Sequence, residues 1–139
     1  MENLDSALEN AKQWCKNNLQ KYILNTENVD YSIFRYNIDD YVTICDMWFK
    51  DTGLIYVSTK KIKELRKIER RLAKDKYRPR EPVEVDEESM FVHEIAEFLL
   101  SFRPEMLKNL DDFWTAHNKA REIENINRKE RGLKDWPEY

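Results

Sequence analysis

The stretch "YSIFRYNIDDYVTICDMWFKDTGLIYVS", residues 31–58, decides the fold class of this chain. It contains three runs rich in β-branched and aromatic residues, "YSIFRY", "YVTICDMWF" and "LIYVS", and such runs are typical of β-strands. The intervening "NIDD" and "KDTG" carry turn residues, and Gly53 tolerates the positive φ of a tight turn. We therefore predict a three-stranded antiparallel meander.

The middle run is apolar on both faces, with the alternating residues Val42, Ile44 and Trp48 against Cys45, Met47 and Phe49. Such a strand is covered on both sides, by helices of its own chain or by another chain. Asp46 and Lys50 are the only pair here that resembles a site for Mg²⁺ and phosphate, and their spacing matches no nuclease pattern. We interpret the acidic residues of this region as turn residues.

Helical periodicity flanks the predicted sheet on both sides. Four segments carry apolar residues at three- and four-residue steps, as amphipathic helices do: residues 4–24, 60–75, 86–102 and 104–131. Ser58 or Thr59 and Asp86 are suitable N-caps, and Gly132 is a suitable helix end. The expected fold is α+β and helix-dominated, with about four helices packed on a small three-stranded antiparallel sheet.

The composition excludes several classes of protein. The chain has 139 residues, of which 41% are apolar, and a net charge of −3; it can form a core and is not a nucleic-acid polycation. Without a Gly-rich phosphate loop, a nucleotide-dependent enzyme is not expected. No apolar run approaches the roughly 18 residues of a membrane span, and the acidic start is not a signal peptide. We expect Cys15 and Cys45 to be thiols in a reducing cytoplasm.

Residues 60–75 predict a helix with an uneven distribution of charge. Its apolar stripe consists of Ile62, Leu65, Ile68 and Leu72. The opposite side carries a row of cations that we name the basic ridge: Lys60, Lys63, Lys67, Arg70, Arg71 and Lys74. Residues 60–80 as a whole contain 11 basic and 3 acidic residues.

Three interpretations of the basic ridge stay open. Its cations can follow a phosphate backbone in a salt-sensitive manner, or they can bind an acidic protein. They can also be the solvated back of a helix, cancelled by the acidic "DEES" downstream. No aromatic residue is interleaved on the ridge for base stacking, so an acidic protein ranks above nucleic acid.

The segment "HEIAE", residues 93–97, resembles the zinc-binding H-E-x-x-H helix with Glu97 in place of the second His. His93 and Glu97 would then be metal ligands, and Glu94 the base of a metal-dependent hydrolase. Against this, the inward stripe of the helix is expected to consist of Val92, Ile95, Leu99 and Phe102. We therefore expect a solvated His–Glu pair, with no catalytic residue, no metal site and no cofactor.

The last predicted helix changes character after Ala120. Before that point its apolar stripe includes His117, which we interpret as a core or interface residue. A helix over residues 104–131 is about 42 Å long, which is about the diameter of such a domain. We therefore expect residues 1–120 to form a single globular domain, and residues 121–139 to form a projecting helix end and a C-terminal tail.

This projecting end carries the remaining candidate contact residues, Ile123, Ile126, Trp136 and Tyr139. The two isoleucines face away from the earlier stripe, and Trp and Tyr are favoured interface anchors. The tail either docks on a neighbouring chain or folds back on its own domain.

The sequence favours a non-enzymatic protein–protein interaction or assembly protein, with the basic ridge and the projecting end as contact surfaces. Its partners are expected to be other protein chains in a larger assembly. A small, charge-dense chain of this kind also suits a viral or phage structural component, in the virion or the host cytoplasm. A nucleic-acid-associated protein that uses residues 60–80 and a metal-dependent hydrolase around His93, Glu94 and Glu97 are the alternatives. No membrane partner is expected.

Overall fold

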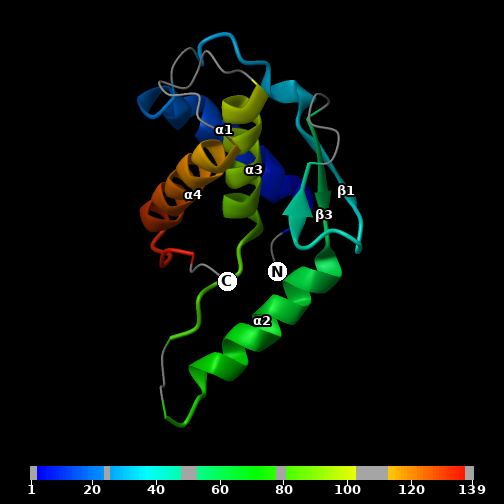
Figure 1. Cartoon of the computed structure of the whole chain (residues 1–139), viewed down its shortest axis with the longest axis vertical. Helices are drawn as coiled ribbons and strands as arrows, with labels where there is room; N and C mark the ends of the chain where they lie inside the picture. Colours follow the sequence, from blue (N-terminus) through cyan, green and yellow to red (C-terminus); the bar gives the residue numbers. More distant parts are fainter. Residues whose placement is uncertain (1–2, 24–25, 48–52, 78–80, 103–112, 137–139) are drawn as a thin grey trace.

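The structure is a computed structural model that describes residues 3–23, 26–47, 53–77, 81–102 and 113–136 (Figure 1). Over these ranges the chain forms helices and one small sheet, so the prediction of a helix-dominated α+β fold is confirmed. The helices are α1 (Leu4–Asn18), α2 (Thr59–Ala73), α3 (Glu87–Phe102) and α4 (Phe113–Glu130). The strands are β1 (Arg35–Ile38), β2 (Cys45–Asp46) and β3 (Leu54–Val57), and short 3-10 turns cover Leu19–Lys21 and Tyr31–Ile33.

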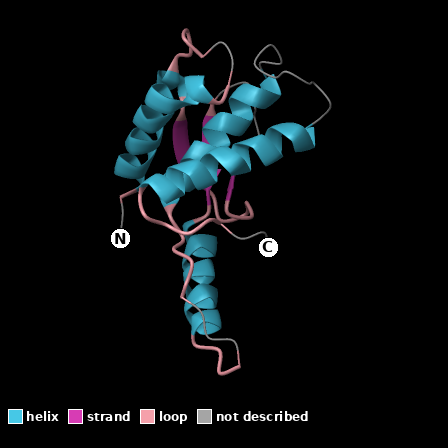
Figure 2. Cartoon of the chain, turned by 90° about the vertical axis from the view of Figure 1, so that its left-hand side faces the viewer, coloured by secondary structure: helices cyan, strands magenta, loops and turns pink. Residues whose placement is uncertain are grey.

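Helix α3 forms the centre of the fold. Helices α1 and α4 pack against it, and the sheet lies behind this layer of helices (Figure 2). Side chains are buried on nearly every side of α3. Val92, Ile95 and Leu99 lie on the expected inward stripe, and the equally buried Met90 and Leu100 lie on other sides of the helix. A helix that is apolar nearly all round belongs in the interior, so α3 has no solvated face of the kind that the sequence pattern suggested.

The sheet is mixed rather than antiparallel, which corrects the predicted meander. Strand β3 lies in the middle, parallel to β1 and antiparallel to β2. Ile55 and Val57 of β3 are both buried, so the strand that contributes most to the core takes the position with partners on both edges. The run around β2 forms an edge instead, and its residues 48–52, including Trp48, Phe49 and Lys50, lie outside the described residues.

Local turn and capping chemistry follows the sequence. Gly53 has φ +74°, and a Cβ at this position would lie 2.8 Å from the Ile33 carbonyl oxygen. Ser58 Oγ accepts a hydrogen bond from the Lys61 N–H at 3.1 Å, and thus caps α2. Gly132, with φ +77°, ends α4. Because each of these features depends on a few neighbouring residues, the sequence alone predicts them.

Helix α4 does not project from the domain, which corrects the expectation for residues 121–131. Its buried positions include Ala116, Ala120, Ile123, Glu124, Asn127 and Arg128. The buried side of the helix continues past Ala120, where it packs against α3. Ile123 is fully buried and Ile126 is half-buried, so Ile123 is not available to a partner.

The tail folds back on its own domain at Trp136. The Trp136 N–H donates a hydrogen bond to Asn125 Oδ1 at 2.8 Å, and the Arg128 guanidinium lies 5.2 Å from the Trp136 ring centroid. Of the two open interpretations of the tail, the structure therefore favours the intramolecular one for this residue. Tyr139 lies outside the described residues.

Two further sequence expectations concern the thiols and the membrane. Cys15 is buried, Cys45 is half-buried, and both are free. Burial raises the pKa of the Cys15 thiol well above its ordinary value, which keeps it in the unreactive protonated form. None of the described helices is long and apolar enough to cross a membrane.

Asp86 caps α3 and ties it to the end of α4. Its Oδ2 accepts a hydrogen bond from the Ser89 N–H at 2.9 Å, and it forms an ion pair with Arg131. Burial alone would raise the pKa of Asp86, but the hydrogen bonds from Arg131 and Ser89 outweigh burial and hold the pKa below its ordinary value. Ionised Asp86 therefore stabilises the folded state.

We predict that Asp86→Ala lowers the free energy of unfolding by about 1–3 kcal/mol at pH 7, because a helix cap and a charged hydrogen bond are both lost. Because the pKa of Asp86 is lower in the folded state, its stabilising contribution is fully present above the unfolded-state pKa of about 4. This contribution is lost as the pH falls through the folded-state pKa. Urea unfolding at pH 7 and pH 3 should therefore show a smaller difference between variant and wild type at pH 3. The exposed Asp135 provides the matched control, since Asp135→Ala should change the stability by less than about 0.5 kcal/mol.

Candidate functional site

Helix α2 extends away from the other helices and the sheet (Figure 1, Figure 2). Its first turn is anchored, because Ile62 is buried and Asp40 Oδ1 accepts hydrogen bonds from Ser58 Oγ and the Lys60 N–H, each at 3.3 Å. Beyond this turn the chain leaves the body of the domain, and we name residues 65–77 the α2 arm. The segment 81–86 returns alongside the arm to α3.

The residues of the basic ridge are all exposed. In the part of the chain that the structure describes, none of these six cations forms an ion pair. The downstream acidic residues pair elsewhere: Glu87 with Arg66 at 2.6 Å, and Asp86 and Glu88 with Arg131. The acidic "DEES" segment therefore does not cancel the ridge, and its charges serve to cap α3 and join it to α2 and α4.

The apolar stripe of α2 is covered only near its start. Ile62 is buried and Leu65 is half-buried, whereas Ile68 and Leu72 remain 39% and 40% exposed. An apolar stripe of this kind ordinarily faces the core of its own domain. Ile68 and Leu72 do not, because the helix continues beyond the edge of the domain. Exposed Ile and Leu side chains at this spacing are what a helix presents when a partner completes its burial.

A groove of about 630 Å³ separates α2 from the returning segment. Arg66, Glu69 and Arg70 line one wall and residues 82–87 line the other. Arg66 spans the groove, since its Nη2 donates a hydrogen bond to the Val85 carbonyl oxygen at 2.9 Å. This contact and the Arg66–Glu87 ion pair hold the returning segment against the arm and fix the direction in which the arm points.

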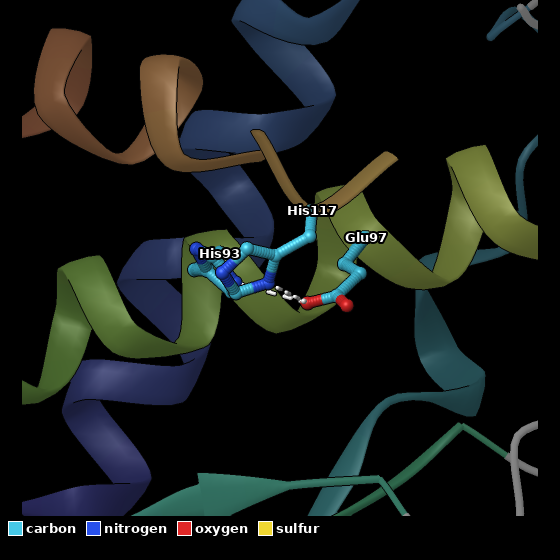
Figure 3. A group of neighbouring side chains, drawn as sticks. All are labelled: His93, Glu97 and His117. Carbon is cyan, nitrogen blue, oxygen red and sulfur yellow. Dashed lines mark hydrogen bonds and ion pairs between the residues drawn. The ribbon is translucent and has the colours of Figure 1, made fainter. Parts of the chain in front are cut away.

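A second polar site lies between α3 and α4, where His93, Glu97 and His117 point toward one another (Figure 3). The distance from His93 Nε2 to Glu97 Oε2 is 2.9 Å, and the distance from His117 Nδ1 to the same oxygen is 3.4 Å. His93 Nδ1 lies 2.9 Å from Glu124 Oε1 of α4. We name these four residues the His–Glu cluster.

The electrostatics of the His–Glu cluster favour positive charge on His93. Burial alone lowers the pKa of His93, but its hydrogen bonds to Glu124 and Glu97 outweigh burial and raise the pKa to about 10. Burial alone would raise the pKa of Glu97, and the contact with His93 instead holds it below its ordinary value. Glu94 beside the cluster behaves differently, because burial raises its pKa to about 8. The carboxylates of Glu97 and Glu124 thus converge on one imidazole.

The expectation that His93 and Glu97 are solvated is wrong. Both lie inside the α3–α4 interface, since α3 is covered on nearly every side. One signal in the sequence pointed to this: Met90 and Leu100 lie on the same side of α3 as the two polar residues. No sequence pattern indicated that Glu124 and His117 contact this pair, because these contacts depend on how α4 packs against α3.

Comparison with known proteins finds no matching family model, no matching curated sequence and no matching solved structure. The arm presents exposed apolar and cationic groups to the outside. Three members of the cluster, His93, His117 and Glu124, line an open cavity of about 170 Å³.

Proposed function

We propose that this protein is a protein–protein interaction or assembly protein that docks its α2 arm in an apolar groove with an acidic rim on a partner chain. The exposed stripe of Ile68 and Leu72, which adjoins the cationic side of the same helix, carries this proposal. In a larger assembly, such as a virion or phage particle, an arm of this kind links its own chain to a different, acidic subunit.

The spacing of the apolar residues supports this mode of docking. Leu65, Ile68 and Leu72 lie at i, i+3 and i+7, which are the anchor positions of an amphipathic helix in a groove. Completing the burial of Ile68 and Leu72 contributes roughly 1 kcal/mol for each side chain. Tyr77 at the end of the arm is exposed as well, and tyrosine is a common interface anchor.

The charges of the arm support an acidic partner. The unpaired cations of the basic ridge attract acidic groups and raise the rate of association with them. A nucleic acid would satisfy these cations but would leave Ile68 and Leu72 in water, because a phosphate backbone offers no apolar surface to cover them. An acidic protein groove satisfies both sets of residues.

Site-specific photo-crosslinking tests this proposal. A photoreactive residue in place of Leu72 should yield a discrete crosslink to one acidic protein in an extract of the native source. The same residue in place of Glu122, an exposed position on α4, should yield none. The crosslink at position 72 should weaken at high salt, because the cations of the ridge are in water.

A pair of double variants separates docking from folding. Ile68→Asp with Leu72→Asp and Lys67→Glu with Arg71→Glu should each reduce the crosslink at least tenfold, with the probe then placed at Tyr77. Neither should change the unfolding temperature by more than a few degrees, since all four side chains are exposed. A crosslink to nucleic acid, a crosslink only to a second copy of this chain, or no crosslink at position 72 would contradict the proposal.

A further inference from the structure

We propose that the His–Glu cluster is a binding site for a divalent transition-metal ion, with His93, Glu97 and His117 as the protein ligands. This site is separate from the α2 arm and does not depend on the docking function. Helix α3 supplies two ligands one turn apart, and α4 supplies the third across the interface (Figure 3).

The spacing of the ligand atoms suits a metal ion. An ion with bonds of about 2.1 Å separates neighbouring ligand atoms by about 3.0–3.4 Å in octahedral or tetrahedral geometry. Glu97 Oε2 lies 2.9 Å from His93 Nε2 and 3.4 Å from His117 Nδ1, and the three ligand atoms all lie within 4.8 Å of one another. Small side-chain rotations are therefore sufficient to place all three around one ion.

Glu124 orients the first ligand. Its Oε1 lies 2.9 Å from His93 Nδ1, so the Nδ1–H can donate to this carboxylate while Nε2 faces Glu97 and His117. A carboxylate behind a histidine is the usual outer partner of a metal-bound imidazole, because it fixes the ring and the tautomer. Glu97 Oε2 and Glu124 Oε1 each lie 2.9 Å from a ring nitrogen of His93, and two carboxylates this close to a ligand attract a dication.

The cluster opens to a cavity of about 170 Å³, which leaves room for a fourth ligand. His93, His117 and Glu124 line this cavity together with Arg121. Arg121 Nη1 is buried and has no hydrogen-bond partner among the described residues. A water molecule or a small anion bound to the metal ion can occupy the cavity and accept a hydrogen bond from this guanidinium group.

The ligand set selects the class of ion. Imidazole nitrogens suit Zn²⁺ and Fe²⁺, whereas Mg²⁺ and Ca²⁺ prefer ligand sets made of oxygen alone. Two histidines and one carboxylate with an open position are found in both zinc and non-haem iron sites. The site therefore suits a divalent transition-metal ion such as Zn²⁺ or Fe²⁺. Separate titrations with the two ions distinguish these candidates.

Calorimetric titration of the untagged, chelator-treated full chain tests the site. Zn²⁺, or Fe²⁺ under anaerobic conditions, should bind with a stoichiometry of one ion per chain and should raise the unfolding temperature. Mg²⁺ and Ca²⁺ should do neither. A wild-type chain that binds neither Zn²⁺ nor Fe²⁺ at micromolar concentrations while folded would overturn the proposal.

Variants locate the ion in the cluster. Glu97→Gln and His117→Ala should each weaken binding at least about 100-fold, and Glu124→Gln about 10- to 100-fold. Glu122→Gln on the surface of α4 and Cys45→Ala beside the cavity should leave binding unchanged. His117 is only half-buried, so His117→Ala should fold even if Glu97→Gln does not. Full binding by folded His117→Ala, or loss of binding by Cys45→Ala in the wall of the same cavity, would show a different set of ligands and refute the proposal.

Discussion

Replacing Arg128 with alanine is expected to lower the free energy of unfolding by about 3–5 kcal/mol. Arg128 is fully buried and joins four parts of the chain. Its Nε donates to the Lys134 carbonyl oxygen at 2.7 Å, its Nη2 to the Glu84 carbonyl oxygen at 2.8 Å, and its Nη1 to Ser89 Oγ at 3.2 Å. The returning segment, α3, α4 and the tail all converge on this one side chain.

The size of the effect follows from what Arg128→Ala leaves behind. Two backbone carbonyl groups lose charged, partly buried hydrogen bonds, and each such loss costs about 1–3 kcal/mol. The Trp136 ring also loses the guanidinium that packs against it. Thermal unfolding should show a fall of roughly 10–20 °C for a chain of this size.

Two control variants accompany this measurement. Lys129→Ala alters the neighbouring exposed residue, whose ion pair with Asp135 is 3.7 Å long, and should cost less than about 1 kcal/mol. Arg128→Lys keeps the charge but cannot span the three acceptors, so its stability should fall between those of wild type and Arg128→Ala. A loss below 1 kcal/mol for Arg128→Ala would show that these hydrogen bonds are not needed to hold the four parts together.

Replacing Phe34 with alanine is expected to cost a further large amount, about 3–5 kcal/mol. Phe34 precedes β1 and is 1% exposed. Its ring meets that of Phe98 edge-on, with a centroid distance of 5.3 Å and an interplanar angle of 88°. The side chain thus joins the sheet to α3, and its removal leaves a cavity at the junction of the two layers.

Urea unfolding provides the measurement for the Phe34 variants. Phe34→Leu retains most of the volume and should cost no more than about 1.5 kcal/mol. Tyr41→Ala removes an aromatic ring that is 95% exposed and should have little effect. Equal losses for Phe34→Ala and Phe34→Leu would indicate that ring geometry, rather than cavity formation, dominates at this position.

Features that depend on neighbouring residues could be predicted from the sequence, whereas features that depend on contacts between distant segments could not. The sequence predicted three strand-forming regions, but Tyr31–Ile33 forms a 3-10 turn and β2 spans only Cys45–Asp46. It did not predict how the strands pair, because alternation of side chains specifies the faces of a strand and not its neighbours. Strand β3 therefore took the central position that was expected for the run around β2. The helical periodicity of α3 likewise predicted one buried stripe. The other sides of the helix are buried only because α1, α4 and the sheet pack against them.

The same limit explains the candidate sites. The cations of the basic ridge follow from helical periodicity, and the structure leaves them exposed as that pattern indicates. The exposure of Ile68 and Leu72 does not follow from it, because periodicity cannot tell how far a helix extends beyond its domain. The sequence singled out His93 and Glu97, but not their contacts with His117 and Glu124, because these contacts join two helices.

By itself, the sequence determined the helix-dominated α+β class, the capping of α2 and α3, the end of α4 at Gly132 and the cationic side of α2. Each of these depends on residues within a few positions of one another, so local physical chemistry is sufficient. The tertiary structure alone decided the strand order, the burial of Arg128 and the meeting of His93 with Glu124. These features join residues far apart in the sequence, and their burial is tolerated only because the complete fold supplies their partners.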